Sequence, residues 1–489
     1  YVIIRSDDKD ELDVDIQKIS SLISTVFGVD LKILESNTLE RNFPRIPMRN
    51  FLDNPMNLSS EELAILFHLP ENPIPSLSRI NIPTFEIPPE SRISDGISIG
   101  NILLYDQEMY PIRLSIEDFR LNTFICGLIG MGKSRLTMNI LQQLTEKHHE
   151  INWICLDWKG EYGYLINEIK SHKILVLTPG SNIAPLKLNM FDPQGSNSDE
   201  HARKLFAIIR EVFKSEFNKQ SELSSQMESV CKEVIRTVVN NPSLRNLQSF
   251  IEELKHYARE HLSENRTIMM TITALINRFD KFKHGILKEV LDVKKSNVNF
   301  DKLMEKKVVF NLNYLLTAGG AKEDVRLLMN LILKYVIDKA LKRGITDTLK
   351  HLVIIEDSQF LIPAILREVP ETSLVEDIPL LLRGVGESLI TIATRPEISH
   401  DIIANSGVKI TFKSPYDSRK IAQYQNLSDE QEHYLRIMPK REAIVTLPNF
   451  QFPFRIYTDF FDYKTLPHED EITQNILSSN IYKQNKHDF

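Results

Sequence analysis

The chain has 489 residues, of which 42% are hydrophobic and 26% charged, and its formal net charge is −7. This length indicates roughly two to four domains with a sizeable core. The near balance of charges excludes a generally basic nucleic-acid coat, so any nucleic-acid surface must be local, such as a groove or a pore. Cys126, Cys155 and Cys231 have no CxxC spacing or His-rich partner. They favour reduced, buried thiols in a cytosolic protein over a metal site or a disulfide.

Residues 1–95 predict a small α+β region and a linker. A strand, a helix and a second strand are expected within residues 1–35, and a short helix with capping-box spacing at Ser59 and Glu62 ends at Pro70. Residues 70–95 are rich in proline and predict an extended linker along a surface. The chain begins at Tyr1 without an initiator methionine, so we expect further residues upstream. No apolar run reaches the roughly 18 residues of a membrane span, which predicts no membrane segment in this chain and a cytoplasmic location.

The rest of the chain alternates short apolar runs with helical segments. Residues 96–197 predict a β-hairpin that turns near Asp106 and the first part of an α/β core, and residues 301–464 predict the second part. Strands this apolar are buried on both faces, so a mainly parallel sheet is expected. Residues 198–300 predict a helical insertion, and the polar residues 465–489 predict a C-terminal tail.

The sequence GLIGMGKS at residues 127–134 fits the pattern G-x-x-x-x-G-K-[ST]. It follows the apolar run NTFIC and opens a segment with apolar residues at helical spacing. In such a loop the backbone N–H groups turn onto phosphate oxygens, the lysine reaches the β- and γ-phosphates, and the serine hydroxyl ligates Mg²⁺. The predicted nucleotide-binding residues of this P-loop are Gly127, Gly130, Met131, Gly132, Lys133, Ser134 and Arg135.

Two acids at the end of a second apolar run complete the expected site. The segment HLVIIEDSQFL ends its strand at Glu356 and Asp357. One acid at such a strand tip holds the metal and the next orients the attacking water. We assign Glu356 to the metal and Asp357 to the water, although the usual order is Asp then Glu.

Further polar residues have two readings each. In LDWKGEYGYL, Asp157 ends a strand expected to neighbour the P-loop strand, and Glu161 follows. Their carboxylates either reach the γ-phosphate water or cap the following segment. Arg383, on a glycine-rich turn, is either a surface charge or a group delivered to the γ-phosphate of a neighbouring subunit.

Several motifs together resemble the HerA/FtsK branch of P-loop ATPases, closest to the HerA-like group that includes the type IV secretion ATPases. The resemblance covers residues 55 to about 460 and rests on the order of SSEELAILFHLP, GLIGMGKS, LDWKGEYGYL, PLKLNMFDP, KVVFNLNYL, HLVIIEDSQFL, LLRGVGESLITIATRP, ANSGVKITF and LSDEQEHYLRIMPKREAIVTL. It implies a RecA-like core, ATP and Mg²⁺ as cofactors, Glu356 and Asp357 as the Walker B pair, and Arg383 as a trans-acting arginine finger. Thr394 stands where the family often has a glutamine sensor.

The resemblance also implies a function and partners. Members of this family form hexameric rings that hydrolyse ATP and pump DNA through a central pore. The expected protein is therefore a ring motor on double-stranded DNA that works with a nuclease or another effector protein in DNA processing or anti-phage defence. The alternatives are a slowly hydrolysing ring that organises a partner enzyme, and a conjugation- or secretion-type ATPase.

Overall fold

The computed structural model describes residues 13–21, 82–90, 96–169, 174–216, 223–262, 267–361, 383–463, 465–479 and 481–482. The chain divides into two compact units, residues 1–79 and 80–489. In the first unit the structure describes a helix at residues 13–21, within the segment where a helix is predicted. The two strands expected beside it and the capped helix that ends at Pro70 lie outside the described residues.

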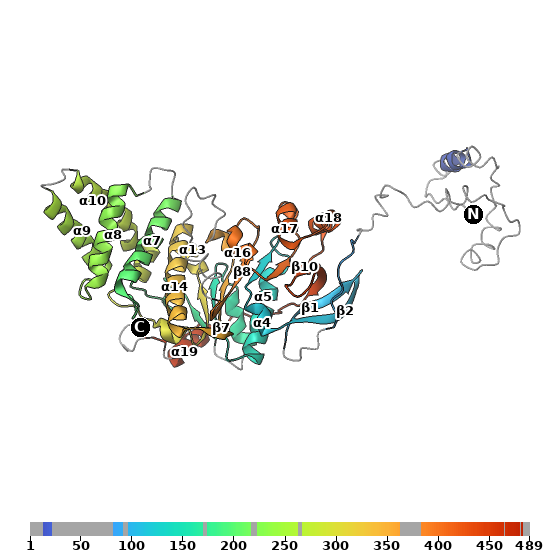
Figure 1. Cartoon of the computed structure of the whole chain (residues 1–489), viewed down its shortest axis with the longest axis horizontal. Coiled ribbons are helices and arrows are strands. Elements are labelled where there is room, and N and C mark those ends of the chain that lie inside the picture. The colour runs from blue at the N-terminus through green and yellow to red at the C-terminus, as the bar shows by residue number, and fades with distance from the viewer. Residues whose placement is uncertain are drawn as a thin grey trace. The chain divides into compact units, whose positions relative to one another are not determined.

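One sheet of eleven strands organises the second unit, in the order β2-β1-β11-β10-β9-β3-β8-β7-β4-β6-β5 (Figure 1). The strands are β1 (Ile97–Leu104), β2 (Gln107–Leu114), β3 (Thr123–Cys126), β4 (Asn152–Asp157), β5 (Ile174–Leu177), β6 (Lys307–Asn311), β7 (Thr346–Ile355), β8 (Val385–Ala393), β9 (Val408–Thr411), β10 (Glu442–Thr446) and β11 (Phe454–Thr458). The strands from β9 to β5 in this order are parallel. Those from β2 to β9 pair antiparallel. The prediction of a mainly parallel α/β sheet is confirmed.

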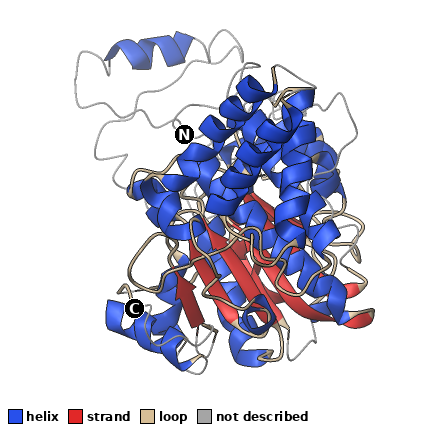
Figure 2. Ribbon diagram, turned by 90° about the vertical axis from the view of Figure 1, so that its left-hand side faces the viewer, coloured by secondary structure: helices blue, strands red, loops and turns tan. Residues whose placement is uncertain are grey.

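Helices cover both faces of this sheet (Figure 2). They are α4 (Ile116–Phe119), α5 (Lys133–Lys147), α6 (Leu165–Glu168), α7 (Ser198–Glu216), α8 (Ser225–Asn240), α9 (Leu247–His261), α10 (Ile268–Phe279), α11 (Gly285–Leu291), α12 (Phe300–Leu303), α13 (Asn313–Thr317), α14 (Lys322–Arg343), α16 (His400–Ala404), α17 (Ser418–Gln425), α18 (Asp429–Ile437) and α19 (Glu469–Ser478). Short 3₁₀ turns are η2 (Tyr162–Tyr164), η3 (Asp280–Lys283) and η4 (Ser358–Phe360).

Successive residues of the central strands enter two different cores, because side chains alternate across a strand. Ile125 of β3 packs in the core that contains Leu136 and Ile140 of α5. Phe124 and Cys126 face the other core, which includes α7, α8 and α14. Since both faces are covered, every residue of β3 is buried. This explains the continuous apolar runs in the sequence.

The helices from α7 to α11 lie between β5 and β6 in the sequence, whereas these two strands are neighbours in the sheet. Helices α8, α9 and α10 lie at one end of the unit, and the β1–β2 hairpin lies at the other (Figure 1). Each of α7, α8 and α9 carries an apolar stripe that packs into the core shared with β3 and β4. The insertion is thus continuous with the core of the sheet.

The segments that flank the α/β core also pack on it. In the proline-rich segment, residues 82–90 run along the surface, where the Glu86 N–H donates to the Pro453 carbonyl at 3.1 Å and Gln431 donates to the Thr84 carbonyl at 2.7 Å. The segment predicted as a polar tail contains α19, which buries Ile476. Helix α19 packs beside β5 through this apolar side chain, and Asn475 of the helix donates a hydrogen bond to the Ile174 carbonyl at 3.5 Å.

The remaining global expectations concern thiols and membranes. The three cysteines are free and buried, as predicted. Among the described helices, none combines the length and the apolar character needed to cross a lipid bilayer.

Candidate nucleotide-binding site

The phosphate loop connects the buried end of β3 to the first residue of α5. Gly127, Gly130 and Gly132 have φ angles of 140°, 80° and 124°, which L side chains rarely adopt. A Cβ on Gly127 would also lie 2.7 Å from the Cβ of Phe412. The glycine density of the motif therefore follows from the backbone path, which directs consecutive N–H groups into one concave loop of the kind that binds anions.

Lys133 is folded back over this loop. Its Nζ donates to the carbonyl oxygens of Gly127 at 2.6 Å and Leu128 at 3.1 Å, and the residue is only 4% exposed. Burial lowers the pKa of Lys133, and the positive charge of Lys159 lowers it further. A buried ammonium group that is held only by neutral carbonyls is stabilised when an anion binds to it. The loop is therefore prepared for a phosphate.

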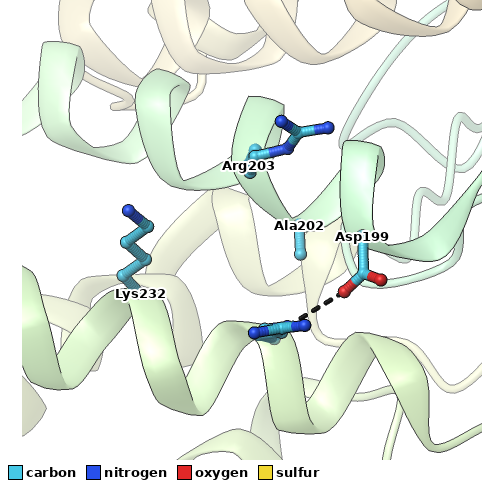
Figure 3. A pocket seen from close by; sticks show the side chains of 5 residues that line it. Asp199, Ala202, Arg203 and Lys232 are labelled. Carbon is cyan, nitrogen blue, oxygen red and sulfur yellow. Dashed lines mark hydrogen bonds and ion pairs between the residues drawn. The ribbon is translucent and has the colours of Figure 1, made fainter.

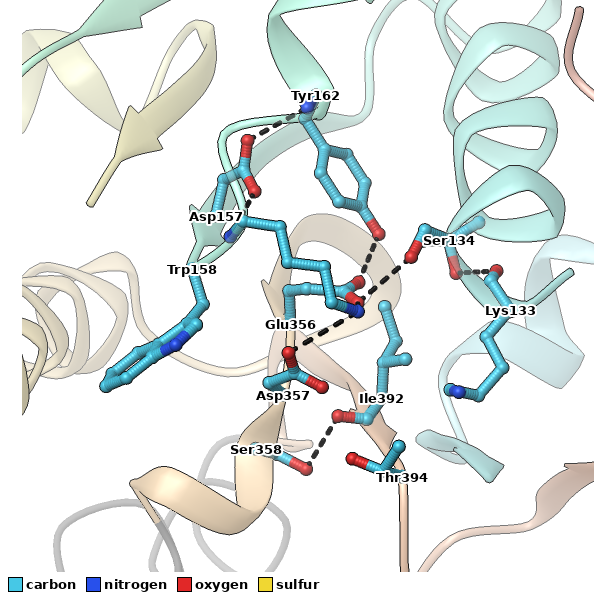
Figure 4. Close-up of polar contacts among 12 residues, drawn as sticks. Lys133, Ser134, Asp157, Trp158, Tyr162, Glu356, Asp357, Ser358, Ile392 and Thr394 are labelled. Carbon is cyan, nitrogen blue, oxygen red and sulfur yellow. Dashed lines mark hydrogen bonds and ion pairs between the residues drawn. The ribbon is translucent and has the colours of Figure 1, made fainter. Parts of the chain in front are cut away.

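Ser134 and Glu356 meet although 222 residues separate them in the sequence. The Ser134 Oγ donates to Glu356 Oε1 at 3.0 Å (Figure 4). Glu356 directly follows β7 and is completely buried. Its other oxygen accepts a hydrogen bond from the Tyr162 hydroxyl at 2.7 Å. The predicted hydroxyl and carboxylate are thus side by side.

Lys159 supplies the positive charge between the two acids. Its Nζ lies 2.6 Å from Glu356 Oε1 and 3.4 Å from Asp357 Oδ2. Burial alone would lower the pKa of Lys159, but the charges of Glu356 and Asp357 outweigh that effect and raise the pKa. Glu161 lies close enough to contribute in the same direction. The acids therefore have an internal counter-ion.

Asp357 adopts a left-handed backbone conformation, with φ 48° and ψ 47°. Few residues other than glycine adopt it, and such strain is often found at functional sites. The Gln359 Nε2 donates to Asp357 Oδ1 at 3.3 Å and to Thr394 Oγ1 at 2.7 Å. The Thr394 N–H donates back to Gln359 Oε1 at 3.2 Å. Gln359 therefore connects the acid to the end of β8.

The structure shows the capping contacts of Asp157. Its carboxylate accepts backbone N–H groups from Lys159 at 3.1 Å, Gly160 at 2.8 Å and Tyr162 at 2.8 Å. Burial raises the pKa of Asp157 to about 7, and these hydrogen bonds oppose the rise. Asp157 therefore caps and shapes the turn that carries Lys159 and Tyr162.

The expected position of the Asp157 strand is wrong. β4 pairs with β6 and β7, whereas the P-loop strand β3 lies between β8 and β9. Strands β7 and β8 come much later in the sequence but insert between β3 and β4. Chain order therefore does not give the spatial neighbour of a strand in a parallel sheet.

The donor set around Ser134 suits a magnesium ion only together with a phosphate. A hydroxyl and carboxylates are the oxygen ligands that Mg²⁺ takes, and Mg²⁺ is usually held by one or two carboxylates plus substrate phosphates. Within the described parts of the chain, no cluster of three or more His, Cys, Asp or Glu side chains forms a metal site by itself. Ser134 and Glu356 would hold the ion, and a bound phosphate would supply further oxygens.

Part of the chain that carries this site is similar to a known family. Residues 97–334 match the family model described as "Helicase HerA, central domain". The matched region is just under half of the chain and is similar to that central domain. It includes the P-loop, Asp157 and Lys159, and it ends before β7. No match was found among curated protein sequences.

Solved structures share the fold. VirB4 of Thermoanaerobacter pseudethanolicus is 14% identical, with a TM-score of 0.54 over 78% of this chain and 100% of that chain. The plasmid coupling protein TrwB in complex with ADP and Mg²⁺ is 10% identical, with a TM-score of 0.54 over 78% and 98%. TrwB with the ATP analogue ADPNP is 10% identical, with a TM-score of 0.55 over 79% and 98%. These likenesses support the predicted RecA-like P-loop fold.

Arg383 lies at the far end of β8 from the P-loop. It is exposed on the turn that precedes Val385, whereas Ala393 at the other end of β8 pairs with Cys126 directly before the P-loop. The nine residues of β8 span about 30 Å. Arg383 therefore cannot reach the phosphate loop of its own chain.

Sequence reasoning missed three residues of the site: Lys159, Tyr162 and Gln359. The carboxylates of the turn after β4 are its evident candidates in the sequence, whereas it is the lysine and the tyrosine of this turn that contact Glu356. A cation on a glycine-containing turn at the end of a central strand is the signal that could have identified Lys159. Gln359 brings a glutamine amide to Thr394, where the family resemblance leads one to expect a glutamine.

A pocket lies in the helical insertion, between α7 and α8 (Figure 3). It has a volume of about 300 Å³ and is lined by Asp199, Ala202, Arg203, Lys232 and Arg236. Arg236 is paired with Asp199 at 3.0 Å. Within the described part of the chain, Arg203 and Lys232 form no ion pair. Three cations and one acid give this basic groove a local positive charge on a chain of net charge −7.

Proposed function

We propose that the chain is an ATP-hydrolysing ring motor that moves duplex DNA through a central pore. The observation that carries the nucleotide part is the contact of Ser134 Oγ with Glu356 Oε1 at 3.0 Å beside the glycine-rich loop. A hydroxyl on the first helical turn and a buried carboxylate at a neighbouring strand end form the metal side of a P-loop site. The HerA central-domain match and the TrwB complexes with ADP, Mg²⁺ and ADPNP support this assignment.

Each residue has a role in the proposed reaction. Lys133 exchanges the Gly127 and Leu128 carbonyls for β- and γ-phosphate oxygens. Ser134 and Glu356 would hold Mg²⁺, which would neutralise phosphate charge. Asp357 accepts a proton from the attacking water. The new bond forms at the γ-phosphorus as its bond to the ADP oxygen breaks, and the electron pair leaves with ADP. Gln359 and Thr394 fix the carboxylate of Asp357.

The Lys159 side chain has to move when a nucleotide binds with its metal. It lies 2.6 Å from the oxygen of Glu356 that also contacts Ser134, so it occupies part of the space that a metal with its ligands requires. Its side chain remains 27% exposed and can therefore swing outward. We infer that Lys159 holds the acids in place without nucleotide and turns towards the γ-phosphate when Mg²⁺ is bound.

The ring supports hydrolysis through Arg383. Because about 30 Å separates Arg383 from its own P-loop, the guanidinium serves a neighbouring subunit. Heterologous contacts of this kind close into rings when the rotation between subunits closes. The proposed assembly is a homo-hexamer, with an effector or nuclease as its protein partner in DNA processing or anti-phage defence.

The basic groove between α7 and α8 is the proposed DNA contact. The net charge of −7 requires a local cationic surface for a polyanion, and Arg203 and Lys232 provide one. Phosphate contacts by such side chains release counterions and are independent of sequence. Ring symmetry would repeat the groove in every subunit.

The second candidate function is a scaffold ring that binds ATP and turns over slowly. The Glu356-Asp357 order and the ion pairs of Lys159 with both acids favour it, because the metal has to displace a bound cation. A motor and a scaffold differ in what accelerates turnover: duplex DNA or a protein partner.

The test is the steady-state ATPase rate with increasing duplex DNA, at several salt concentrations. We expect DNA to raise the rate, with a stimulation that weakens steeply as salt rises. The double variant Arg203→Glu and Lys232→Glu should need at least about tenfold more DNA for half-maximal stimulation and lose part of the salt dependence. Lys255→Glu, an exposed lysine of α9, is the matched control. DNA-independent turnover in the parent would favour the scaffold, and unchanged stimulation in the double variant would remove the groove from the DNA path.

A further inference from the structure

A nucleotide in the P-loop must extend in a known direction. The lysine and serine of the motif contact the β- and γ-phosphates and Mg²⁺, so the γ-phosphate lies towards Glu356. With the γ-phosphate towards Glu356, we expect the α-phosphate beside the first turn of α5, next to the residue that follows Ser134. That residue is Arg135, and the ribose and the base extend beyond it.

Arg135 points to an aromatic segment that follows β11. Its guanidinium carbon lies 3.4 Å from the ring centroid of Tyr463 and 4.8 Å from that of Phe460. The Arg135 Nη1 also donates to the Phe461 carbonyl at 2.7 Å. Residues 458–463 thus pass beside the first turn of α5, on the side where the base would lie.

A second arginine, Arg441, reaches the same aromatic segment from the turn directly before β10. The guanidinium carbon of Arg441 lies 4.3 Å from the ring centroid of Tyr457 and 4.9 Å from that of Phe460. Cations within about 6 Å of an aromatic centroid are attracted by the ring quadrupole. Phe460 therefore has two guanidinium neighbours, one from the P-loop helix and one from the turn before β10.

The backbone of Arg441 is held in an unusual conformation to do this. Its φ angle is 70°, a left-handed conformation that residues other than glycine rarely adopt. The Arg441 N–H donates to the P-loop carbonyl of Met131 at 3.1 Å, and its own carbonyl accepts the Thr458 N–H at 2.8 Å. Arg441 thus connects the phosphate loop to β11 through backbone hydrogen bonds. These bonds fix its position beside the place where a nucleotide would bind.

Phe460 is available for a ligand, since it is 38% exposed, whereas the next residue, Phe461, is 3% exposed. We propose that the purine base of the nucleotide packs on the exposed part of the Phe460 ring, beside the Arg441 and Arg135 guanidiniums that lie over that ring. Aromatic rings and guanidinium planes are the groups on which proteins stack bases. This inference rests on the proposed binding of a nucleoside triphosphate in the P-loop.

The experiment compares two probes, ATP and inorganic tripolyphosphate, in equilibrium binding with Mg²⁺. Tripolyphosphate has the phosphates but no base, so it separates the base site from the phosphate loop. The Phe460→Ala variant loses one stacking contact, so it should bind ATP roughly tenfold more weakly than the parent. Its affinity for tripolyphosphate should change less than about twofold. Phe460→Leu keeps the apolar volume without the ring and should show most of the same loss. Arg441→Lys, which keeps the charge without the guanidinium plane, should also weaken ATP selectively.

Phe452→Ala is the matched control, because Phe452 is 52% exposed and lies before β11. It should bind both probes like the parent, and thermal melting would show that each variant is folded. Unchanged ATP binding by Phe460→Ala, or equal weakening of ATP and tripolyphosphate, would overturn the base site. Failure of the parent to bind either probe would instead contradict the proposed nucleotide function.

Discussion

Replacement of Lys159 by methionine tests the internal counter-ion of the site. The change removes the ion pairs to Glu356 at 2.6 Å and to Asp357 at 3.4 Å but keeps the length of the side chain. Glu356 is completely buried, so without Lys159 its charge is held by the hydroxyls of Ser134 and Tyr162 alone. Breaking a buried pair costs about 3–5 kcal/mol. Lys159 retains 27% exposure, which screens the pair, so we expect a loss of about 2–3 kcal/mol.

This loss converts to a small but measurable shift in melting temperature. With an unfolding entropy of about 2.1 cal/mol/K per residue, the unit of about 410 residues formed by Ile80–Phe489 has about 0.9 kcal/mol/K. Lys159→Met should therefore melt about 3 °C below the parent without nucleotide. Saturating ADP with Mg²⁺ brings a new positive charge to Glu356, so the deficit should shrink to below about 1 °C.

Calorimetry of the parent and the variant, with and without Mg²⁺ and ADP, measures this difference. Lys350→Met is the matched control, because Lys350 is an exposed lysine of the same strand that leads to Glu356. The reasoning fails if Lys159→Met melts with the parent in the absence of nucleotide, or if its deficit is the same in both conditions.

Four further substitutions test the other parts of the site. Lys133→Ala should abolish ATP turnover while the melting temperature without nucleotide stays within about 2 °C of the parent, and normal turnover would remove the P-loop assignment. Asp357→Asn should keep ATP-dependent assembly but stop hydrolysis, whereas Glu356→Gln should also weaken the Mg²⁺ dependence in a metal titration; the reverse pattern would exchange the two roles. Arg383→Ala should lower turnover roughly 10³–10⁵-fold with little change in ATP affinity. When Arg383→Ala is mixed with Lys133→Ala under conditions in which rings exchange subunits, part of the ATPase rate should return. Mixed rings that are as inactive as either variant alone would show that Arg383 does not act in trans.

The parts of the site that depend on neighbouring residues could be predicted from the sequence. The phosphate loop is one continuous segment, and its glycines, lysine and serine report the backbone conformation and the charge that a phosphate needs. The apolar runs likewise predict buried parallel strands, because both faces of each strand are covered. The pair Glu356 and Asp357 could be found for the same reason, since it directly follows such a run.

Contacts between distant segments could not be predicted in this way. Lys159 and Glu356 are 197 residues apart and meet only because β4 and β7 are adjacent in the sheet. The sequence motif around Asp157 suggests a role at the phosphate, whereas the fold uses its carboxylate to cap the turn that presents Lys159. The contact of Gln359 with Thr394 likewise depends on β7 and β8 pairing, and residue types alone do not reveal it.

The proposed motor is tested most directly by images of single particles with Mg²⁺, a non-hydrolysable ATP analogue and duplex DNA. A closed ring would bring the Arg203 and Lys232 side chains of every subunit around one polyanion, so the ring rather than the free chain should hold the DNA. The account predicts hexameric rings with duplex density in the channel. Free subunits, or rings whose channel stays empty while DNA binds elsewhere, would contradict it.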